Sequence, residues 1–186
     1  NIEDIKIHIQ DADTVHHLAG ITDVAYVKKD SDKEQDELIK RVAIDGTNNV
    51  LNSMNPNSQI VFPSTHVVFE GLKEPKENID EKEETNTFLA YSSSKVVNEN
   101  QIINSGKRHT IFRLGSVYGF STDTMRIGIM PNLFSKIASQ NGTIKLFGGG
   151  VQLKSLVPLI DVARAFKYVE ENNNIEDGIY NLTKEN

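Results

Sequence analysis

Gln59-Ile-Val-Phe62 is an apolar run followed by Pro63, and the pattern predicts a short buried β-strand that the proline ends. His109-Thr-Ile-Phe-Arg-Leu114 predicts a second buried strand. Residues 92–104 between these runs predict a helix that stops at Ser105-Gly106. A strand, a helix and another strand in succession are typical of parallel α/β architecture, so the expected fold class is α/β.

The same kind of pattern extends outward in both directions. Residues 28–37 and 73–84 are dense in charge and predict solvated segments. Apolar residues at steps of three and four predict helices, and short apolar runs next to glycine or proline predict strands. The further predicted helices are 2–9, 39–54, 130–140 and 160–171, and the further predicted strands are 13–19, 143–147, 153–158 and 178–182.

The composition is that of a folded globular chain. Its 186 residues are 38% apolar and 25% charged, with a net charge of −6. The negative charge argues against nucleic acid and membrane surfaces as partners. The absence of cysteine excludes disulfides, thiol catalysis and cysteine-based metal sites. No apolar run approaches a bilayer span and residues 1–10 do not resemble a signal peptide, so the expected location is cytoplasmic.

Tyr91-Ser-Ser-Ser-Lys95 places a phenol and an ammonium four residues apart, on one face of the predicted helix. A nearby ammonium favours the phenolate and lowers the pKa of the tyrosine. A tyrosine tuned in this way can take a proton from an alcohol near neutral pH. Thr65 lies at the carboxyl end of a predicted parallel strand, the edge where ligands gather in open α/β sheets. Its hydroxyl could hold a substrate oxygen while Tyr91 removes the proton.

Six motifs in order resemble the extended short-chain dehydrogenase/reductases, the NAD-dependent epimerase/dehydratase family that includes UDP-glucose 4-epimerase-like proteins. The resemblance covers nearly the whole chain. It implies an incomplete Rossmann-like doubly wound parallel sheet in residues 1–125 and part of a smaller substrate lobe, with strand and helix elements that return to the sheet, in residues 126–186. The motifs are His17-Leu-Ala-Gly20, Asp45-Gly-Thr-Asn-Asn-Val-Leu51, Ser64-Thr-His-Val-Val-Phe-Glu-Gly71, Tyr91-x-x-x-Lys95, Phe112-Arg-Leu-Gly-Ser-Val-Tyr-Gly119 and Leu156-Val-Pro-Leu-Ile-Asp-Val-Ala163.

The resemblance also implies a set of site residues and a cofactor. Tyr91 corresponds to the general base, Lys95 to the residue that binds the nicotinamide ribose, and Thr65 to the residue that polarises the reacting oxygen. The expected cofactor is NAD, with NADP left open, and the expected substrate is a nucleotide sugar. Family members often dimerise through the helix that carries the tyrosine, so a homodimer is possible. The other cofactor-binding candidates are Leu18, Ala19, Gly20, Ser64 and Leu114, and the substrate-binding candidates are Thr65, His66, Ser116, Asn132 and Lys154.

The chain departs from the family pattern in ways that bear on its activity. The glycine-rich dinucleotide fingerprint after the first strand is absent, which predicts that the chain is an internal fragment lacking roughly two βα units at its start. The family's substrate lobe is also expected to continue past the end. Ala43, Ser116 and Lys154 replace a frequent cofactor-side asparagine, a substrate asparagine and a phosphate-binding arginine, and they leave the substrate open.

Several functions remain in competition. An NAD(P)-dependent epimerase that oxidises a sugar hydroxyl and reduces the ketone again is favoured. A reductase remains open because residues 64–71 also resemble dTDP-4-dehydrorhamnose reductases. A dehydratase is disfavoured, because His66-Val67 occupies the place of an acidic pair that elimination of water requires. A non-catalytic dinucleotide-binding or scaffold protein is the alternative from another class.

Two weaker constellations predict no site. His16-His17 could suggest a metal, but adjacent strand residues point to opposite faces, so no metal is expected. Ser64 and His66 could suggest a hydrolase, but the sequence has no Gly-x-Ser-x-Gly elbow.

Overall fold

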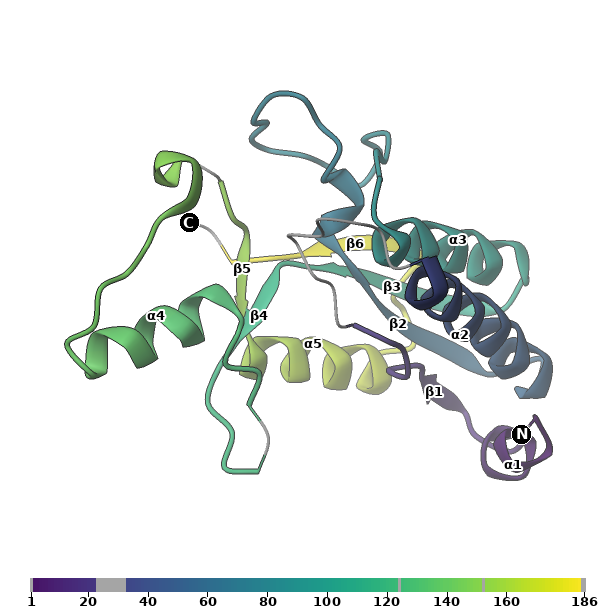
Figure 1. Cartoon of the computed structure of the whole chain (residues 1–186). Helices are drawn as coiled ribbons and strands as arrows, with labels where there is room; N and C mark the ends of the chain where they lie inside the picture. The colour runs from purple at the N-terminus through teal and green to yellow at the C-terminus, as the bar shows by residue number, and fades with distance from the viewer. Residues whose placement is uncertain (1, 23–32, 124, 152, 185–186) are drawn as a thin grey trace.

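The computed structural model describes residues 2–22, 33–123, 125–151 and 153–184. Its main sheet has four strands, all parallel, which lie side by side as shown in Figure 1. In spatial order they are β1 (Thr14–His16), β2 (Gln59–Thr65), β3 (Arg108–Leu114) and β6 (Gly178–Leu182). This arrangement confirms the α/β, Rossmann-like parallel sheet that the sequence predicts.

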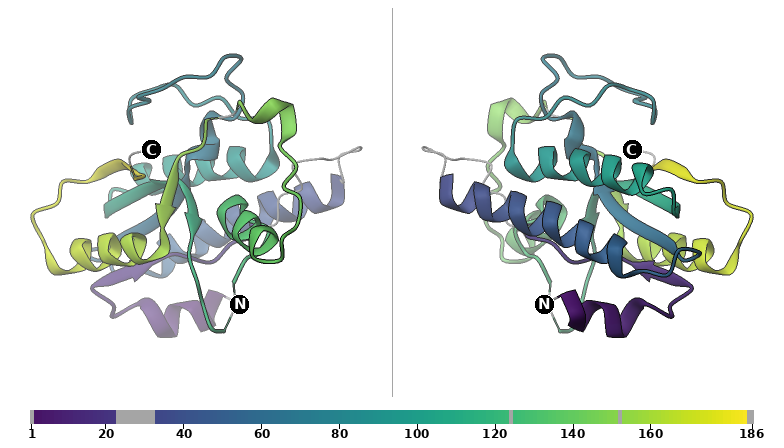
Figure 2. Two further views of the ribbon diagram at one scale, coloured as in Figure 1. Left: turned by 90° about the vertical axis from the view of Figure 1, so that its left-hand side faces the viewer. Right: turned by 90° about the vertical axis from the view of Figure 1, so that its right-hand side faces the viewer.

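Helices cover both faces of this sheet. α2 (Lys33–Ser53) and α3 (Ala90–Asn104) pack together on one face, and α1 (Ile2–Ile9) contacts α2. α5 (Leu159–Glu171) lies on the other face, as the two turned views in Figure 2 show. Because side chains alternate along a strand, Ile60 and Phe62 enter the core under α3, whereas Val61 packs toward α5. The apolar runs read from the sequence therefore form two cores, one on each face.

A second parallel sheet of two strands lies beside the first. Of these two strands, only β5 was predicted from the sequence. It pairs β4 (Ser116–Tyr118) with β5 (Leu156–Pro158). α4 (Met130–Ser139), with Pro131 in its first turn, precedes β5. β4 follows β3 after the single residue Gly115, so the sequence pattern merges the two strands and only β3 is predicted. A Cβ at Gly115 would be tightly placed, because the carbonyl oxygen of Ser155 lies 3.0 Å from that position.

Four predicted segments differ from the structure. The predicted strand 143–147 does not form. Residues 143–146 are exposed and pair with no described strand. Residue 147 begins a 3-10 turn, η2 (Phe147–Gly150). The predicted strands 13–19 and 153–158 shorten to three residues each. Of the segment 28–37 predicted to be solvated, residues 33–37 begin α2, and residues 28–32 lie outside the described residues. The division at residue 125 stays a prediction; β6 is a strand of the main sheet and α5 packs on it.

The prediction that Pro63 ends its strand is wrong, since β2 continues to Thr65. Alternate residues of a central strand bond to opposite neighbours, and the carbonyl of Val61 accepts the His17 N–H on the β1 side at 3.0 Å. Pro63, two residues on, faces the same side, beyond the last residue of β1. Its missing N–H therefore costs the sheet no hydrogen bond, and β3 continues to pair with β2 as far as Leu114.

Among the described residues, no helix is both long and apolar enough to cross a membrane.

Candidate functional site

The candidate residues gather at the carboxyl edge of the main sheet. Thr65 is the last residue of β2, Leu114 is the last residue of β3, and the two are in register. α3 begins at Ala90 and brings Tyr91 into its first turn, beside that edge. In open parallel sheets this is the edge at which ligands bind.

Lys95 is held at the end of β2 by two contacts. Its ammonium donates a hydrogen bond of 2.8 Å to the carbonyl of Pro63 and lies 4.2 Å from the centre of the Phe62 ring. The Pro63 carbonyl is on the side of β2 that β1 no longer covers, so the lysine occupies the place where a strand would continue. Burial lowers the pKa of Lys95 to about 8, against the opposing charge of Glu99. The side chain is therefore a cation at neutral pH that can lose its proton at modest cost.

Tyr91 and Lys95 share one face of α3, as the spacing predicts. The Lys95 ammonium lies 5.9 Å from the centre of the half-buried Tyr91 ring. The turn that carries Tyr91 is fixed by Glu70, which comes directly after the 3-10 turn η1 (His66–Phe69). The Glu70 carboxylate accepts the N–H groups of Phe88 and Leu89 at 3.1 and 2.8 Å, and the Ser92 hydroxyl as well. Glu70 thus acts as the N-terminal cap of α3.

Thr65 and Ser64 make different contacts although they are adjacent. The Thr65 hydroxyl oxygen accepts the N–H of Val67 at 3.2 Å and caps η1. This contact uses the oxygen and leaves the hydroxyl proton for another acceptor. The Ser64 hydroxyl is buried and donates to Glu99 at 2.5 Å, on the α3 side of the sheet. Thr65 is therefore the hydroxyl suited to donate to a substrate oxygen, whereas Ser64 would have to break its bond to Glu99 to do so.

His66 has a defined hydrogen-bonding state. Its Nδ1 lies 2.9 Å from the Leu114 carbonyl oxygen, which can only accept, so Nδ1 carries the proton. Burial lowers the pKa of His66, and the positive charge of Lys154 lowers it as well, while the Leu114 hydrogen bond acts in the opposite direction. The ring is therefore neutral at pH 7, with Nε2 as a hydrogen-bond acceptor.

The remaining candidates lie around the same edge in less enclosed positions. Leu18, Ala19 and Gly20 follow β1 and are exposed. Ser116, half-buried, donates its backbone N–H to the Ser155 carbonyl at 2.8 Å, and Lys154 is exposed. The side-chain amide of Asn132 bonds to the segment between β4 and α4. It accepts the Gly119 N–H at 3.3 Å and donates to the Arg126 carbonyl at 3.1 Å.

Glu99 lies near the candidate site and was not predicted from the sequence, whereas His17 was considered only as part of a metal candidate and of a family motif. His17 is 7% exposed and its Nε2 lies 3.0 Å from the Thr47 hydroxyl oxygen, while His16 is exposed. Burial, followed by the charge of Lys95, lowers the pKa of His17 to about 4. Glu99 lies one helical turn after Lys95, a spacing that could have drawn attention to it.

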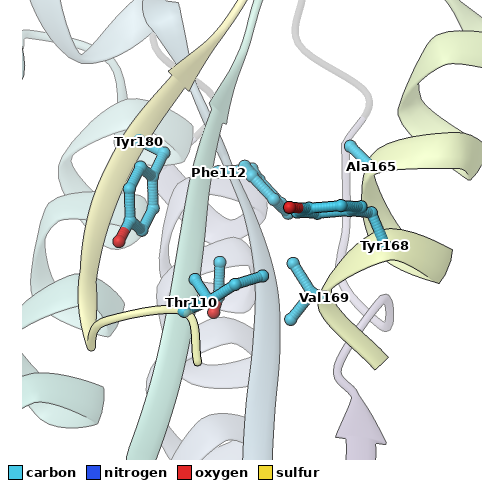
Figure 3. Close-up of a pocket in the computed structure, with 7 residues that line it drawn as sticks. Thr110, Phe112, Ala165, Tyr168, Val169 and Tyr180 are labelled. Atoms are coloured by element: carbon cyan, nitrogen blue, oxygen red, sulfur yellow. The ribbon is translucent and has the colours of Figure 1, made fainter. Parts of the chain in front are cut away.

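A separate apolar pocket of about 300 Å³ lies on the opposite face of the sheet (Figure 3). Thr110 and Phe112 of β3, Tyr180 of β6 and Tyr168 of α5 line it, with Ala165, Val169 and Ile175. Because α3 lies on the other face, this pocket contains none of the candidate residues and is not the site that the sequence predicts.

The chain matches the model of the NAD dependent epimerase/dehydratase family over residues 2–183. No curated protein gives a significant match. Among solved structures, UDP-glucose 4-epimerase from Thermotoga maritima with UDP-glucose has a TM-score of 0.81 at 20% identity, over 98% of this chain and 60% of that one. UDP-glucuronic acid 4-epimerase from Bacillus cereus, bound to a UDP-sugar analogue and NAD, has a TM-score of 0.80 at 20% identity, over 100% and 59%.

A third similar structure is dTDP-4-dehydrorhamnose reductase from Clostridium acetobutylicum, with a TM-score of 0.73 at 24% identity, over 100% of this chain and 61% of that one. At these identities the likeness shows the fold. The chain spans about three fifths of the length of these proteins.

Proposed function

The chain belongs to the NAD dependent epimerase/dehydratase family, and on this premise we propose that the whole protein is an NAD-dependent epimerase of nucleotide sugars. The observation that carries the proposal is the grouping of Tyr91, Lys95 and Thr65 at one edge of the parallel sheet. Tyr91 and Lys95 share a face of α3, and Thr65 ends the strand whose Pro63 carbonyl holds the lysine.

Each of these side chains has a defined task in such a reaction. Thr65 donates its free hydroxyl proton to the reacting sugar oxygen and so fixes its position. Tyr91, as the general base, takes the proton of the same sugar hydroxyl and later returns it. The Lys95 ammonium stabilises the tyrosinate electrostatically and can bind a ribose hydroxyl.

NAD is the cofactor that the family description names, and when bound it supplies a reversible acceptor for hydride. The residues fit its nicotinamide half: Lys95 is a half-buried cation beside Tyr91, and the exposed residues Leu18, Ala19 and Gly20 border the same edge. A Cβ at Gly20 would meet no atom of the described residues within 4 Å, so these residues leave space beside it. Ser64 and Leu114 are the remaining cofactor candidates, and NADP stays open.

The substrate would lie on the side of Thr65 away from β1. His66 offers the acceptor Nε2 to a sugar hydroxyl, and the exposed Lys154 offers a positive charge to a diphosphate. Ser116 and Asn132 complete the set of proposed substrate residues. The absence of nucleic acid and membrane partners and the cytoplasmic location remain predictions of the sequence.

A nucleotide-sugar reductase is the second candidate. The observation that favours it is Ser64-Thr-His-Val-Val-Phe-Glu-Gly71, the motif that resembles dTDP-4-dehydrorhamnose reductases. Net consumption of NADH or NADPH distinguishes a reductase from an epimerase, which regenerates its cofactor in each turnover.

We also propose a homodimer through α2 and α3. These two helices pack against each other, and each presents apolar side chains that are 39–42% exposed: Leu38, Val42, Val97 and Ile103. Such side chains on neighbouring helices favour contact with a second apolar surface.

The test of the proposed function is Tyr91→Phe in the whole protein, assayed with UDP-sugars and NAD. We expect turnover to fall at least about 100-fold, the usual contribution of a general base, with little change in substrate affinity. Tyr168→Phe is the matched control, because Tyr168 lies on α5 at the opposite face and should keep normal turnover. A Tyr91→Phe protein with a normal rate would refute the assignment.

A further inference from the structure

A buried ion pair between Arg113 and Glu99 lies beneath the candidate site. Arg113 is 4% exposed and Glu99 is 3% exposed. The guanidinium meets the carboxylate with two hydrogen bonds, Nη2 to Oε2 at 2.7 Å and Nε to Oε1 at 3.1 Å. A buried ion pair is a costly feature that apolar side chains could often replace without loss of stability. The proposed chemistry does not use either group directly, so the pair calls for another explanation.

Arg113 is anchored on its other side as well. Its Nη1 donates to the Glu81 carbonyl at 3.2 Å, and its guanidinium carbon lies 5.3 Å from the centre of the Phe69 ring. The Glu81 side chain in turn accepts the N–H of Asn181 in β6 at 2.7 Å. The arginine therefore joins β3 to the loop after β2, and it presents Glu99 with a fixed positive partner.

Glu99 reaches two parts of the candidate site. It accepts the Ser64 hydroxyl at 2.5 Å, and Ser64 stands between Pro63, whose carbonyl binds Lys95, and Thr65. It also lies four residues after Lys95 on α3, one turn away on the same face. One carboxylate thus contacts the strand end and faces the lysine.

We propose that Glu99, held in place by Arg113, is a positioning residue of the site: it fixes the strand end at Ser64, and its negative charge stabilises the ammonium of Lys95. The effect on turnover rests on the proposed function, whereas the effect on the lysine does not.

The charges around Lys95 support this role. Burial favours the neutral amine, and Glu99 is the charge that opposes burial and raises the pKa of Lys95. His17, the other titratable side chain facing it from the β1 side, is neutral at pH 7 because its pKa is about 4. Tyr91 lies on the same face of α3, and Arg113 stands beyond Glu99. Without Glu99, only the Pro63 carbonyl and the Phe62 ring would still favour the ammonium against burial.

The test removes both charges of the ion pair together, because removing one alone leaves an unpaired buried charge and can unfold the protein. In the whole protein, Glu99→Gln combined with Arg113→Met is compared with the wild type. The pKa of individual lysines is measured by competitive acetylation across a pH range, with mass spectrometry of the peptides. The exposed Lys40 serves as the internal reference.

We expect the proton affinity of Lys95 to fall about threefold or more in the double variant while Lys40 is unchanged, because Glu99 lies one helical turn from Lys95, whereas Arg113 stands beyond Glu99 and its loss cancels only part of the effect. Glu99→Asp keeps the charge and should keep the lysine titration close to that of the wild type. A folded double variant in which Lys95 titrates as in the wild type overturns the proposal.

Two further measurements keep the outcomes separate. If the double variant does not fold, Glu99→Leu with Arg113→Leu removes the same charges with apolar side chains and is judged by the same titration. Turnover is then recorded against pH. The limit of the pH profile that depends on the Lys95 ammonium should move to lower pH, because the pKa of Lys95 falls in the double variant. If Tyr91→Phe abolishes turnover while Lys95 is unaffected by the double substitution, only the role of Glu99 is refuted. If the lysine shifts but the protein epimerises no sugar, only the proposed function fails.

Discussion

Replacement of Glu70 by alanine should destabilise the fold by about 2 kcal/mol through the loss of the α3 cap. The Glu70 carboxylate accepts two backbone N–H groups, from Phe88 and Leu89, and the Ser92 hydroxyl. A lost N-cap costs about 1 kcal/mol, and the interaction of a negative charge with the helix N-terminus adds roughly 0.3–1 kcal/mol. The hydrogen bonds are charge-assisted, and those from Leu89 and Ser92 are half-buried, which places the sum toward the upper part of this range.

The assay is urea unfolding of the whole protein, followed by circular dichroism, with the midpoint compared at constant slope. Glu70→Gln should cost about half as much as Glu70→Ala, because the amide oxygen still accepts a hydrogen bond but the charge is gone. Glu74→Ala is the matched control: Glu74 is an exposed carboxylate in the same loop, and its loss should change stability by less than about 0.5 kcal/mol. Equal effects of Glu70→Ala and Glu74→Ala would refute the capping role.

Three other predictions concern pH, packing and assembly. The pKa of His17 is lowered from 6.5 to about 4, so between these pH values the unfolded chain binds more protons than the folded one. The free energy of unfolding should therefore fall by a few kcal/mol as the pH drops from 6.5 toward 4. In His17→Gln the urea midpoint should decline less over the same pH range. Gly71→Ala should lower the melting temperature, because its Cβ would collide with the Asn86 side chain, whereas Gly46→Ala in open space within α2 should raise it; the opposite order would contradict the packing. Val97→Glu should convert a dimer to a monomer in sedimentation, and a wild-type monomer would remove the dimer proposal.

The sequence predicts the centre of the main sheet because β2 and β3 are buried along almost their whole length and therefore contain short apolar runs. Residues 109–114 are read correctly as a strand for this reason, and Tyr91 and Lys95 share a face of α3 because their spacing matches one helical turn. The prediction fails at Pro63, where the end of the neighbouring strand β1 makes the proline harmless. The residue pattern of one β-strand does not show where the strand paired with it ends.

Long-range polar contacts are the other part that sequence patterns do not show. Glu70 caps a helix that begins about twenty residues later in the chain, and Glu99 meets Arg113 from a neighbouring strand. Both glutamates occupy positions with no local apolar or capping pattern of their own. Their contacts are set by the packing of α3 on the sheet, which only the three-dimensional structure reveals.

The pairing of β3 with β6 has a consequence for synthesis on the ribosome. Thr110 of β3 pairs with Gly178 of β6, and the His109 N–H donates to the Asp177 side chain, 68 positions further along the chain. While the polypeptide is still emerging, that side of β3 has no partner and presents open peptide groups to other nascent chains. We expect this strand border to stay open until β6 has left the ribosomal exit tunnel.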